Sequence, residues 1–136
     1  MYLLDTNVLS ELRRHRHAHP NVVAWASKLH PSELFLSAIT ILEIERGILL
    51  RERQDRAQGA VLRAWFDERV LPQFEGRILP VDAEVARRCA ALHVPDPRPH
   101  SDAFIAATAL VHGLKLATRN LDDFKNLGAE IINPWD

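Results

Sequence analysis

Three carboxylates and one amide stand at points of the sequence where an apolar run ends or a helical pattern begins. Asp5 directly follows an apolar run, and Asn120 follows a later one. Glu43 lies in the first turns of a long helical pattern, and Asp102 opens another. Carboxylate and amide oxygens are the hard ligands that Mg²⁺ and Mn²⁺ prefer. The residue types therefore predict a divalent-metal site, provided that the fold brings these four positions together.

The elements that must position these residues are short apolar runs, which alternate with longer helical patterns. The apolar runs predict strands at residues 2–4, 34–38, 77–81, 114–118 and 129–133. The helical patterns predict helices at residues 5–15, 21–29, 40–54, 59–71, 82–93, 101–113 and 121–127. Strands separated by helices favour right-handed crossovers and a parallel sheet covered on both faces. We expect one α/β domain over residues 1–136, with its ligands beyond the carboxyl ends of the strands.

Each of the four residues also has a local structural explanation. Asp5 and Asp102 can cap helices, because the helix dipole favours a negative charge at that end. Thr40 and Glu43 have the spacing of a capping box, and Asn120 suits a turn. Both explanations stay open for each residue alone. Taken together, the local explanation is weaker, since four caps would have to gather at one sheet edge by chance.

Composition restricts the possible partners and the compartment. The formal net charge is −1, so contact with nucleic acid must rest on local basic groups such as Arg13, Arg14 and Arg46. Cys89 is the one cysteine, which excludes an internal disulfide and favours a reducing compartment. There is no signal-peptide pattern and no apolar run of the ~18 residues needed to span a bilayer. We expect a soluble, cytoplasmic protein with no membrane contact.

Four blocks of the sequence together resemble the signature blocks of PIN-domain ribonucleases. They are LLDTNVLSE at residues 3–11, SAITILEIERG at 37–47, SDAFIAATA at 101–109 and LATRNLDDF at 116–124. Within that family the chain is most similar to the VapC toxins. Its segments LPQFEGRILPVD at 71–82 and NPWD at 133–136 resemble the FitB-like subgroup. The resemblance covers the chain from Met1 to Asp136.

The resemblance implies a fold, an activity and partners. The fold would be a PIN-like three-layer α/β/α arrangement with a five-stranded parallel sheet. The activity would be that of an endoribonuclease toxin of a type II toxin–antitoxin system, hydrolysing RNA phosphodiester bonds with Mg²⁺, or with Mn²⁺ in its place. The implied partners are a cognate antitoxin, a second copy of the chain in a homodimer, and operator DNA in a larger complex with the antitoxin.

The resemblance also assigns roles to individual residues. The family's catalytic and metal-holding acids fall on three positions, Asp5, Glu43 and Asp102. The fourth catalytic position, often an acid in the family, is Asn120 here, and Asp123 follows three residues later. Thr6 and Thr118 match positions whose hydroxyl groups support the acids. Because position 120 is an amide, the alternative function is a catalytically weak or inactive PIN-like module that binds antitoxin or nucleic acid.

Two other protein classes gather acids beyond a parallel sheet, and both fit less well. A receiver domain needs paired acids after its first strand and a lysine after its fifth. Here Asp5 stands alone, Asp82 after the third predicted strand has the position of a helix cap, and NPWD follows the fifth strand. A phosphatase with an aspartyl intermediate needs Asp-x-Asp, whereas position 7 is Asn7. The nuclease interpretation uses all of the acids that the pattern brings to one edge.

Overall fold

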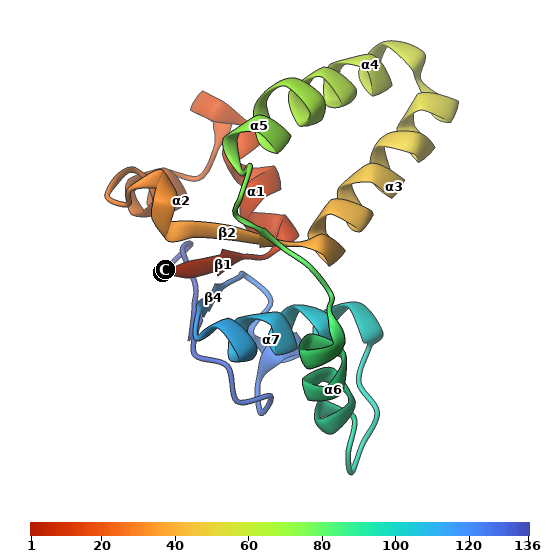
Figure 1. The fold of residues 1–136 in the computed structure, drawn as a ribbon. Helices are drawn as coiled ribbons and strands as arrows, with labels where there is room; N and C mark the ends of the chain where they lie inside the picture. The colour runs from red at the N-terminus through yellow and green to blue at the C-terminus, as the bar shows by residue number, and fades with distance from the viewer.

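Short strands alternate with helices through all of residues 1–136, which the computed structural model describes (Figure 1). The strands are β1 (Tyr2–Leu4), β2 (Leu34–Ser37), β3 (Ile78–Leu79), β4 (Lys115–Ala117) and β5 (Ile131–Ile132). The helices are α1 (Thr6–Arg13), α2 (Pro20–Ser27), α3 (Ala38–Gln54), α4 (Arg56–Trp65), α5 (Leu71–Gln73), α6 (Ala83–Leu92), α7 (His100–His112) and α8 (Leu121–Phe124). Short turns of other helix types are η1 (His15–His17), η2 (Pro31–Glu33) and the π-helical η3 (Phe66–Val70). None of the helices combines the length and the apolar composition required to cross a lipid bilayer.

The five strands form one parallel sheet with the order β3-β2-β1-β4-β5. β1 is central, with Leu3 opposite Phe35 of β2 and Leu116 of β4. The strand order reverses between β1 and β4, and such a point is where open parallel sheets bind their ligands. The predicted α/β fold with a five-stranded parallel sheet is therefore confirmed.

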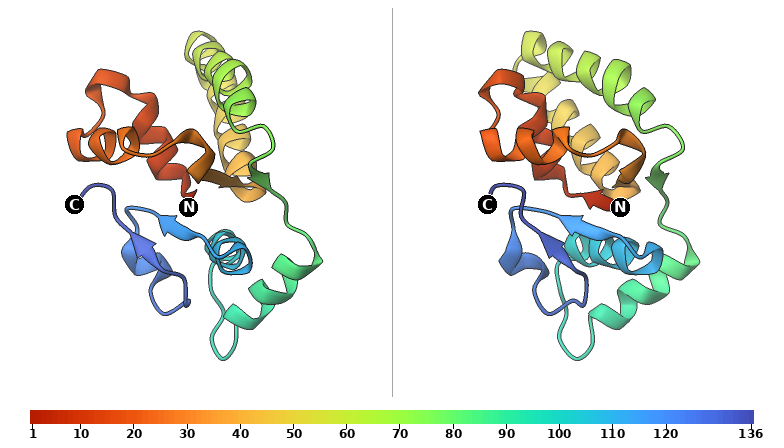
Figure 2. Two further views of the ribbon diagram at one scale, coloured as in Figure 1. Left: turned by 60° about the vertical axis from the view of Figure 1, so that its left-hand side comes forward. Right: turned by 90° about the vertical axis from the view of Figure 1, so that its left-hand side faces the viewer.

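Helices cover both faces of the sheet (Figure 2). Leu3 and Leu4 are both fully buried, in separate apolar clusters, because successive strand residues point to opposite faces. Leu4 packs in the cluster formed with α1, α2, α3 and η3. Leu3 packs in the cluster formed with α7 and α8, and α6 packs in turn against α7. The layers are thus helix, sheet and helix, as the resemblance implied.

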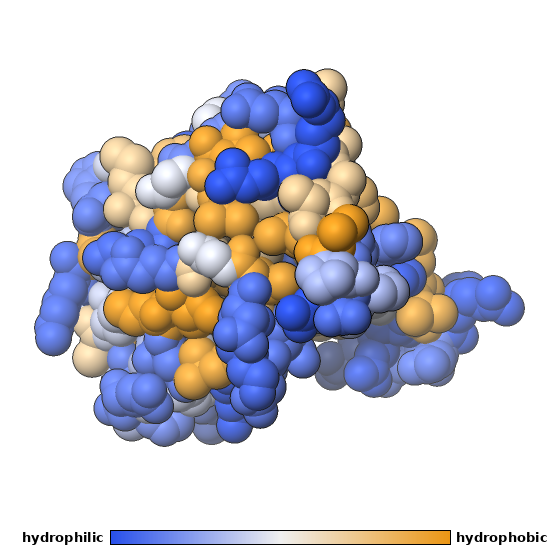
Figure 3. All heavy atoms as spheres, turned by 90° about the horizontal axis from the view of Figure 1, so that it is seen from below, coloured by the Kyte–Doolittle hydropathy of each residue, from blue (hydrophilic) through white to orange (hydrophobic).

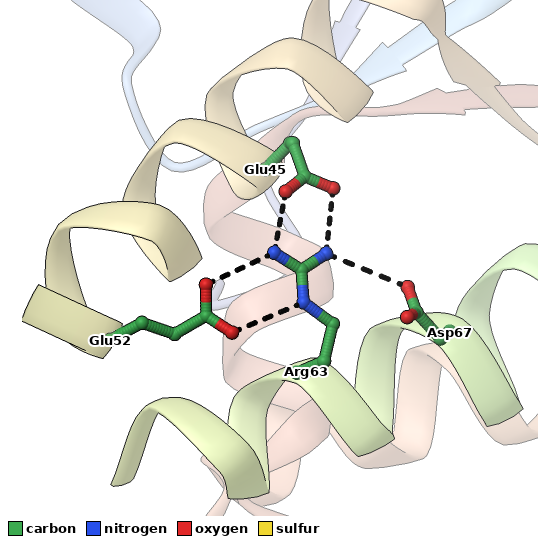
Figure 4. A network of polar contacts seen from close by, with 4 residues as sticks. All are labelled: Glu45, Glu52, Arg63 and Asp67. Atoms are coloured by element: carbon green, nitrogen blue, oxygen red, sulfur yellow. Dashed lines mark hydrogen bonds and ion pairs between the residues drawn. The ribbon is translucent and has the colours of Figure 1, made fainter. Parts of the chain in front are cut away.

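Helices α3 and α4 form an arm that extends away from the sheet (Figure 1). They approach so closely that a Cβ atom at Gly59 would lie 2.6 Å from Cα of Glu52. Arg63 of α4 donates hydrogen bonds to Glu45 at 2.8 and 2.6 Å and to Glu52 at 3.3 and 3.4 Å (Figure 4). The carboxylate of Asp67 lies 3.7 Å from the same guanidinium. This network holds α4 against α3 by charge as well as by packing.

The helix predicted at residues 59–71 is divided in the structure. Asp55 caps α4 by accepting from Gln58 N–H at 3.1 Å, so the helix begins earlier than its apolar pattern indicates. The chain then passes through the π-helical turn η3, where Phe66 and Val70 are buried, before α5 begins. The periodicity of apolar residues does not distinguish a π-helical turn from an α-helical one over so short a segment.

Two of the predicted strands are shorter than their apolar runs. The run at residues 77–81 forms only the two residues of β3, because Pro80 has no N–H with which to extend the ladder. The run at residues 129–133 likewise forms only the two residues of β5. These are the two edge strands of the sheet. The central strands, which carry the candidate site, lie where the sequence predicts them.

Candidate functional site

Asp5, directly after β1, is the most buried acidic residue of the chain, with 6% of its surface exposed. Its backbone N–H donates to the carbonyl oxygen of Ala117 at 2.9 Å and extends the pairing of β1 with β4. Its carboxylate accepts from Thr118 Oγ1 at 2.8 Å, from Thr6 N–H at 2.8 Å and from the Asn7 amide at 3.3 Å. Burial raises the pKa of Asp5 although the bonds from Thr118 and Thr6 oppose the rise. Asp5 is therefore both the cap of α1 and a firmly oriented carboxylate.

The structure decides between the two explanations of Glu43. Ser37, rather than Thr40, caps α3, because its hydroxyl oxygen accepts from Ile39 N–H at 3.0 Å. The helix consequently begins two residues before the predicted start, and Thr40 is fully buried inside it. The capping box of Thr40 and Glu43 does not form, so the carboxylate of Glu43 is available for another role.

Glu43 projects from α3 toward α1. Thr6 Oγ1 donates to Glu43 Oε1 at 3.1 Å and lies 3.5 Å from the hydroxyl oxygen of Thr40. Burial raises the pKa of Glu43, and the charge of Asp5 adds to the rise. The hydrogen bond from Thr6 and the charge of Arg46 act in the opposite direction. The hydroxyl of Thr6 thus connects the acid on α3 with the end of β1.

Asp102 lies in the first turn of α7, which packs on the opposite face of the sheet from α3. Its carboxylate does not cap the helix, since α7 begins two residues earlier without a side-chain cap. The pKa of Asp102 is raised to about 6, first by burial and next by the charge of Asp123. Asp5 and Glu43 add repulsion in the same direction. We call Asp5, Glu43, Asp102 and Asp123 the acidic cluster, because their charges interact across three helices and the end of β1.

Asp123, not Asn120, is the fourth charge of this cluster. The Asn120 side chain makes no hydrogen bond, and its backbone N–H donates to Thr118 Oγ1 at 3.0 Å. Both residues line an open hollow of about 430 Å³ beside α8. The charge of Asp123 raises the pKa of Asp5 as well as that of Asp102. Asn120 therefore borders the cluster without a hydrogen bond to its carboxylates.

Sequence reasoning missed the supporting role of Asn7. Its amide donates to Asp5 Oδ2 at 3.3 Å and to Thr118 Oγ1 at 3.4 Å, and its oxygen accepts from Arg119 N–H at 3.4 Å. Asn7 thereby links the residues that follow β1 to those that follow β4. The available signal was its place two residues after Asp5, in the first turn of a helix that starts at the sheet edge.

The three arginines predicted to contact RNA lie in different surroundings. Arg46 is close enough to the acidic cluster to lower the pKa of Glu43. Arg14 is paired with Glu11 at 3.2 Å. The guanidinium of Arg13 lies over the Trp65 ring, 5.7 Å from its centroid, in the cleft between α1 and α4. The structure therefore does not gather all three beside the carboxylates.

The acidic cluster fits a divalent cation in donor type and in charge. Its oxygens are hard donors, and burial followed by mutual repulsion raises the pKa values of Asp5 and Asp102, a repulsion that a bound cation relieves. No group of three or more His, Cys, Asp or Glu side chains is arranged to hold a metal ion. Mg²⁺ usually keeps several waters and binds through one or two carboxylates, so a set of three protein ligands is not required.

Comparison with known proteins identifies relatives along the whole chain. A family model described as "PIN domain" matches residues 2–130. The VapC ribonuclease Y4jK of Sinorhizobium fredii is 36% identical over 143 aligned residues, covering 100% of this chain and 99% of the relative. The toxin FitB of Neisseria gonorrhoeae is 39% identical over 143 aligned residues, covering 99% of both chains.

A solved structure agrees with the fold described above. The structure of FitAB bound to an IR36 DNA fragment superposes with a TM-score of 0.89 at 36% identity. The match covers 100% of this chain and 96% of the other. The sheet, its flanking helices and the arm therefore belong to a fold that a close relative also adopts.

Proposed function

This chain belongs to the PIN-domain family, and from that membership we propose that it is a metal-dependent endoribonuclease toxin controlled by a cognate antitoxin. The observation that carries the proposal is the acidic cluster at the point where the strand order reverses. Four carboxylates that repel one another at a sheet edge cost stability, and acids with pKa values perturbed in this way are typical of functional sites. Hydrolysis of a phosphodiester backbone assisted by a divalent cation is a function that uses such acids.

We assign the metal-holding role to Asp5, Glu43 and Asp102, with Mg²⁺ as the cation and Mn²⁺ as its substitute. When bound, a divalent cation polarises a phosphoryl oxygen and lowers the pKa of an attacking water. The protein's part is to orient the ligands. Thr118, Thr6 and Asn7 hold the Asp5 carboxylate in one direction, and Oδ1, which accepts only the bond from Thr6 N–H, keeps a free lone pair.

The remaining assigned residues support this arrangement. Thr6 orients Glu43 and Thr118 orients Asp5, each through its hydroxyl group. Asp123 adds negative charge that favours cation binding, and Asn120 lines the adjoining hollow, where its amide can position a water. Arg46 beside Glu43 is the best placed of the three candidate arginines to contact a phosphate of the substrate.

We propose an antitoxin, a second copy of the chain and operator DNA as partners. The support for the first and third is the name of the toxin FitB and the structure of FitAB bound to DNA. Exposed apolar residues on the arm, Leu42, Leu49, Leu50 and Val61, offer surface that a protein partner would cover. Apolar patches also reach the surface between hydrophilic residues on the face seen from below (Figure 3).

The proposal is tested with a circular single-stranded RNA, which only an endonuclease can open. We expect the antitoxin-free protein to linearise this RNA with millimolar Mg²⁺ or Mn²⁺ and to leave it intact with EDTA. A circular DNA of the same sequence is the matched substrate control. RNA binding without metal-stimulated cleavage would instead support the inactive binding module.

A further inference from the structure

A second hollow adjoins the acidic cluster on the side of α1 and the C-terminus. Its volume is about 340 Å³, and it lies between the end of α1, the start of α2 and the residue that follows Thr118. The polar and aromatic residues that line it are Glu11, Arg14, His17, His19, Arg119 and Trp135. We call it the basic hollow.

Arg119 connects the two hollows. It lines both the basic hollow and the hollow that contains Asn120 and Asp123. Its backbone N–H donates to Asn7 Oδ1 at 3.4 Å, and the Asn7 amide in turn contacts Asp5. A ligand that extends across Arg119 therefore reaches from the basic hollow to the carboxylates.

The guanidinium of Arg119 is oriented but unpaired. It lies over the Trp135 ring, 5.2 Å from the centroid, and makes no hydrogen bond or ion pair with another side chain. The main chain of Trp135 is itself held, because the Asn21 amide donates to its carbonyl oxygen at 2.8 Å and its backbone N–H donates to Asn133 Oδ1 at 3.0 Å. The cation–π contact holds the guanidinium over the ring and leaves its N–H donors free for a ligand.

The one acid in the basic hollow, Glu11, is ionised and already paired. Glu11 accepts from His19 N–H at 2.7 Å and from Arg14 at 3.2 Å, and these bonds hold its pKa below the usual range. Arg14 and Arg119 carry two positive charges against the single charge of Glu11. The basic hollow is therefore net positive beside a cluster that is strongly negative.

We propose that Arg119, stacked on Trp135 and assisted by Arg14, binds a backbone phosphate of single-stranded RNA next to the phosphate that lies at the acidic cluster. The proposal rests on the proposed nuclease function and adds a substrate-binding subsite to it. A guanidinium matches the geometry of phosphate oxygens, and a cation beside an aromatic ring is a common way of holding single-stranded nucleic acid. The negative cluster needs such a neighbour, because it repels the rest of the RNA backbone.

The test is RNA binding by Arg119→Gln, measured by fluorescence anisotropy with a labelled single-stranded RNA in EDTA at several salt concentrations. We expect affinity to fall about tenfold, and the slope of log affinity against log salt to become shallower by about 0.7, as for one lost phosphate contact. Arg119→Lys, which keeps the charge but not the stacked fork, should lie in between. Arg88→Gln on the exposed face of α6 is the matched control and should bind within twofold of the wild type.

The outcomes separate this subsite from the proposed function, because binding in EDTA does not require cleavage. If Arg119→Gln binds RNA as Arg88→Gln does, the subsite is wrong even when the wild type cleaves RNA. If Arg119→Gln weakens RNA binding but no variant cleaves RNA with metal, the proposed activity is wrong and the subsite stands. A loss of antitoxin binding with unchanged RNA binding would reassign the basic hollow to the protein partner and overturn the proposal.

Discussion

On the arm, Glu45, Glu52 and Asp67 surround one guanidinium, whereas the carboxylates of the acidic cluster repel one another. The hydrogen bonds from Arg63 lower the pKa of Glu45, while burial and repulsion raise the pKa of Asp102. The first group of acids supports folding and needs nothing further. The second costs stability as it stands and gains from an added cation.

One helix contributes to both groups. Glu43 and Glu45 are two residues apart on α3, so they point to nearly opposite sides of the helix. Glu43 faces α1 and the sheet edge, and Glu45 faces α4. Two acids that look equivalent in the sequence are therefore separated into a functional role and a structural one by the elements that α3 packs against.

The largest expected difference between the two groups is in activity. Asp102→Asn should lower metal-dependent RNA cleavage about 100-fold or more, because it removes charge where the cation is held. Asp5→Ala should do the same. Glu45→Gln, an acid-to-amide change on the arm, should keep activity within about twofold of the wild type. Steady-state cleavage of a labelled RNA measures this difference, and circular dichroism verifies that each variant folds. Full activity in Asp102→Asn would show that Asp102 is not part of the site.

Cation binding should raise stability through the acidic cluster alone. In millimolar Mn²⁺ the wild type should gain about 1–3 kcal/mol of unfolding free energy, as expected for an ion well above its dissociation constant. Glu43→Gln should lose most of that gain, and Glu52→Gln on the arm should retain it. Thermal melting with Mn²⁺ and with EDTA is the measurement. An equal gain in Glu43→Gln and the wild type would place the cation elsewhere.

The stability of the wild type should fall as the pH rises, because folding raises the pKa of Asp102. The pKa of Asp102 rises from 3.8 in the unfolded chain to about 6 in the folded protein. The protonated form of Asp102 therefore contributes its full stabilisation below about pH 4, and this contribution is lost as the pH rises through 6. In EDTA, Asp102→Asn should therefore gain about 1–2 kcal/mol relative to the wild type between pH 4 and pH 7, after allowance for solvent screening. Urea unfolding of both proteins at the two pH values measures this. A difference that does not change with pH would show that Asp102 titrates normally.

Asn120→Asp tests whether position 120 belongs to the acidic cluster. An added charge should lower the melting temperature in EDTA by repulsion and enlarge the rise on adding Mn²⁺. Each change should be smaller than that of Glu43→Gln, because Asn120 is exposed and its side chain makes no hydrogen bond to the carboxylates. Asp122→Asn, also exposed on α8, is the companion variant and should leave the Mn²⁺-induced rise unchanged. If the rise is the same in Asn120→Asp and the wild type, position 120 lies outside the metal site.

The smallest effect should come from the arm. Arg63→Gln removes the guanidinium charge that pairs with three partly exposed acids. It should lower the melting temperature by at most about 4 °C, more at low salt than at high salt. RNA cleavage should not change. Arg53→Gln, an exposed arginine on α3, serves as the control. A large loss of activity in Arg63→Gln would show that the arm positions Glu43 and that the two groups are coupled.

Much of the fold follows from the sequence alone because its signals are local. Alternation of apolar runs with helical patterns is sufficient to predict a parallel sheet. Gly113 ends α7 with a positive φ of 65°, and Asp82 caps α6 by accepting from Val85 N–H at 2.9 Å, both as their residue types indicate. The place of Asp5 at the end of a buried strand likewise needs no tertiary information.

Only the tertiary structure decides which residues meet. Thr118 donates to Asp5 across 113 positions of sequence, and that contact exists because β4 pairs with β1 in one register. The stacking of Arg119 on Trp135 depends on how the C-terminal segment returns past α2. The same holds for the approach of Asp123 to Asp5 and Asp102, whose pKa values its charge raises. Local rules act over a few residues, whereas these contacts depend on strand order and register.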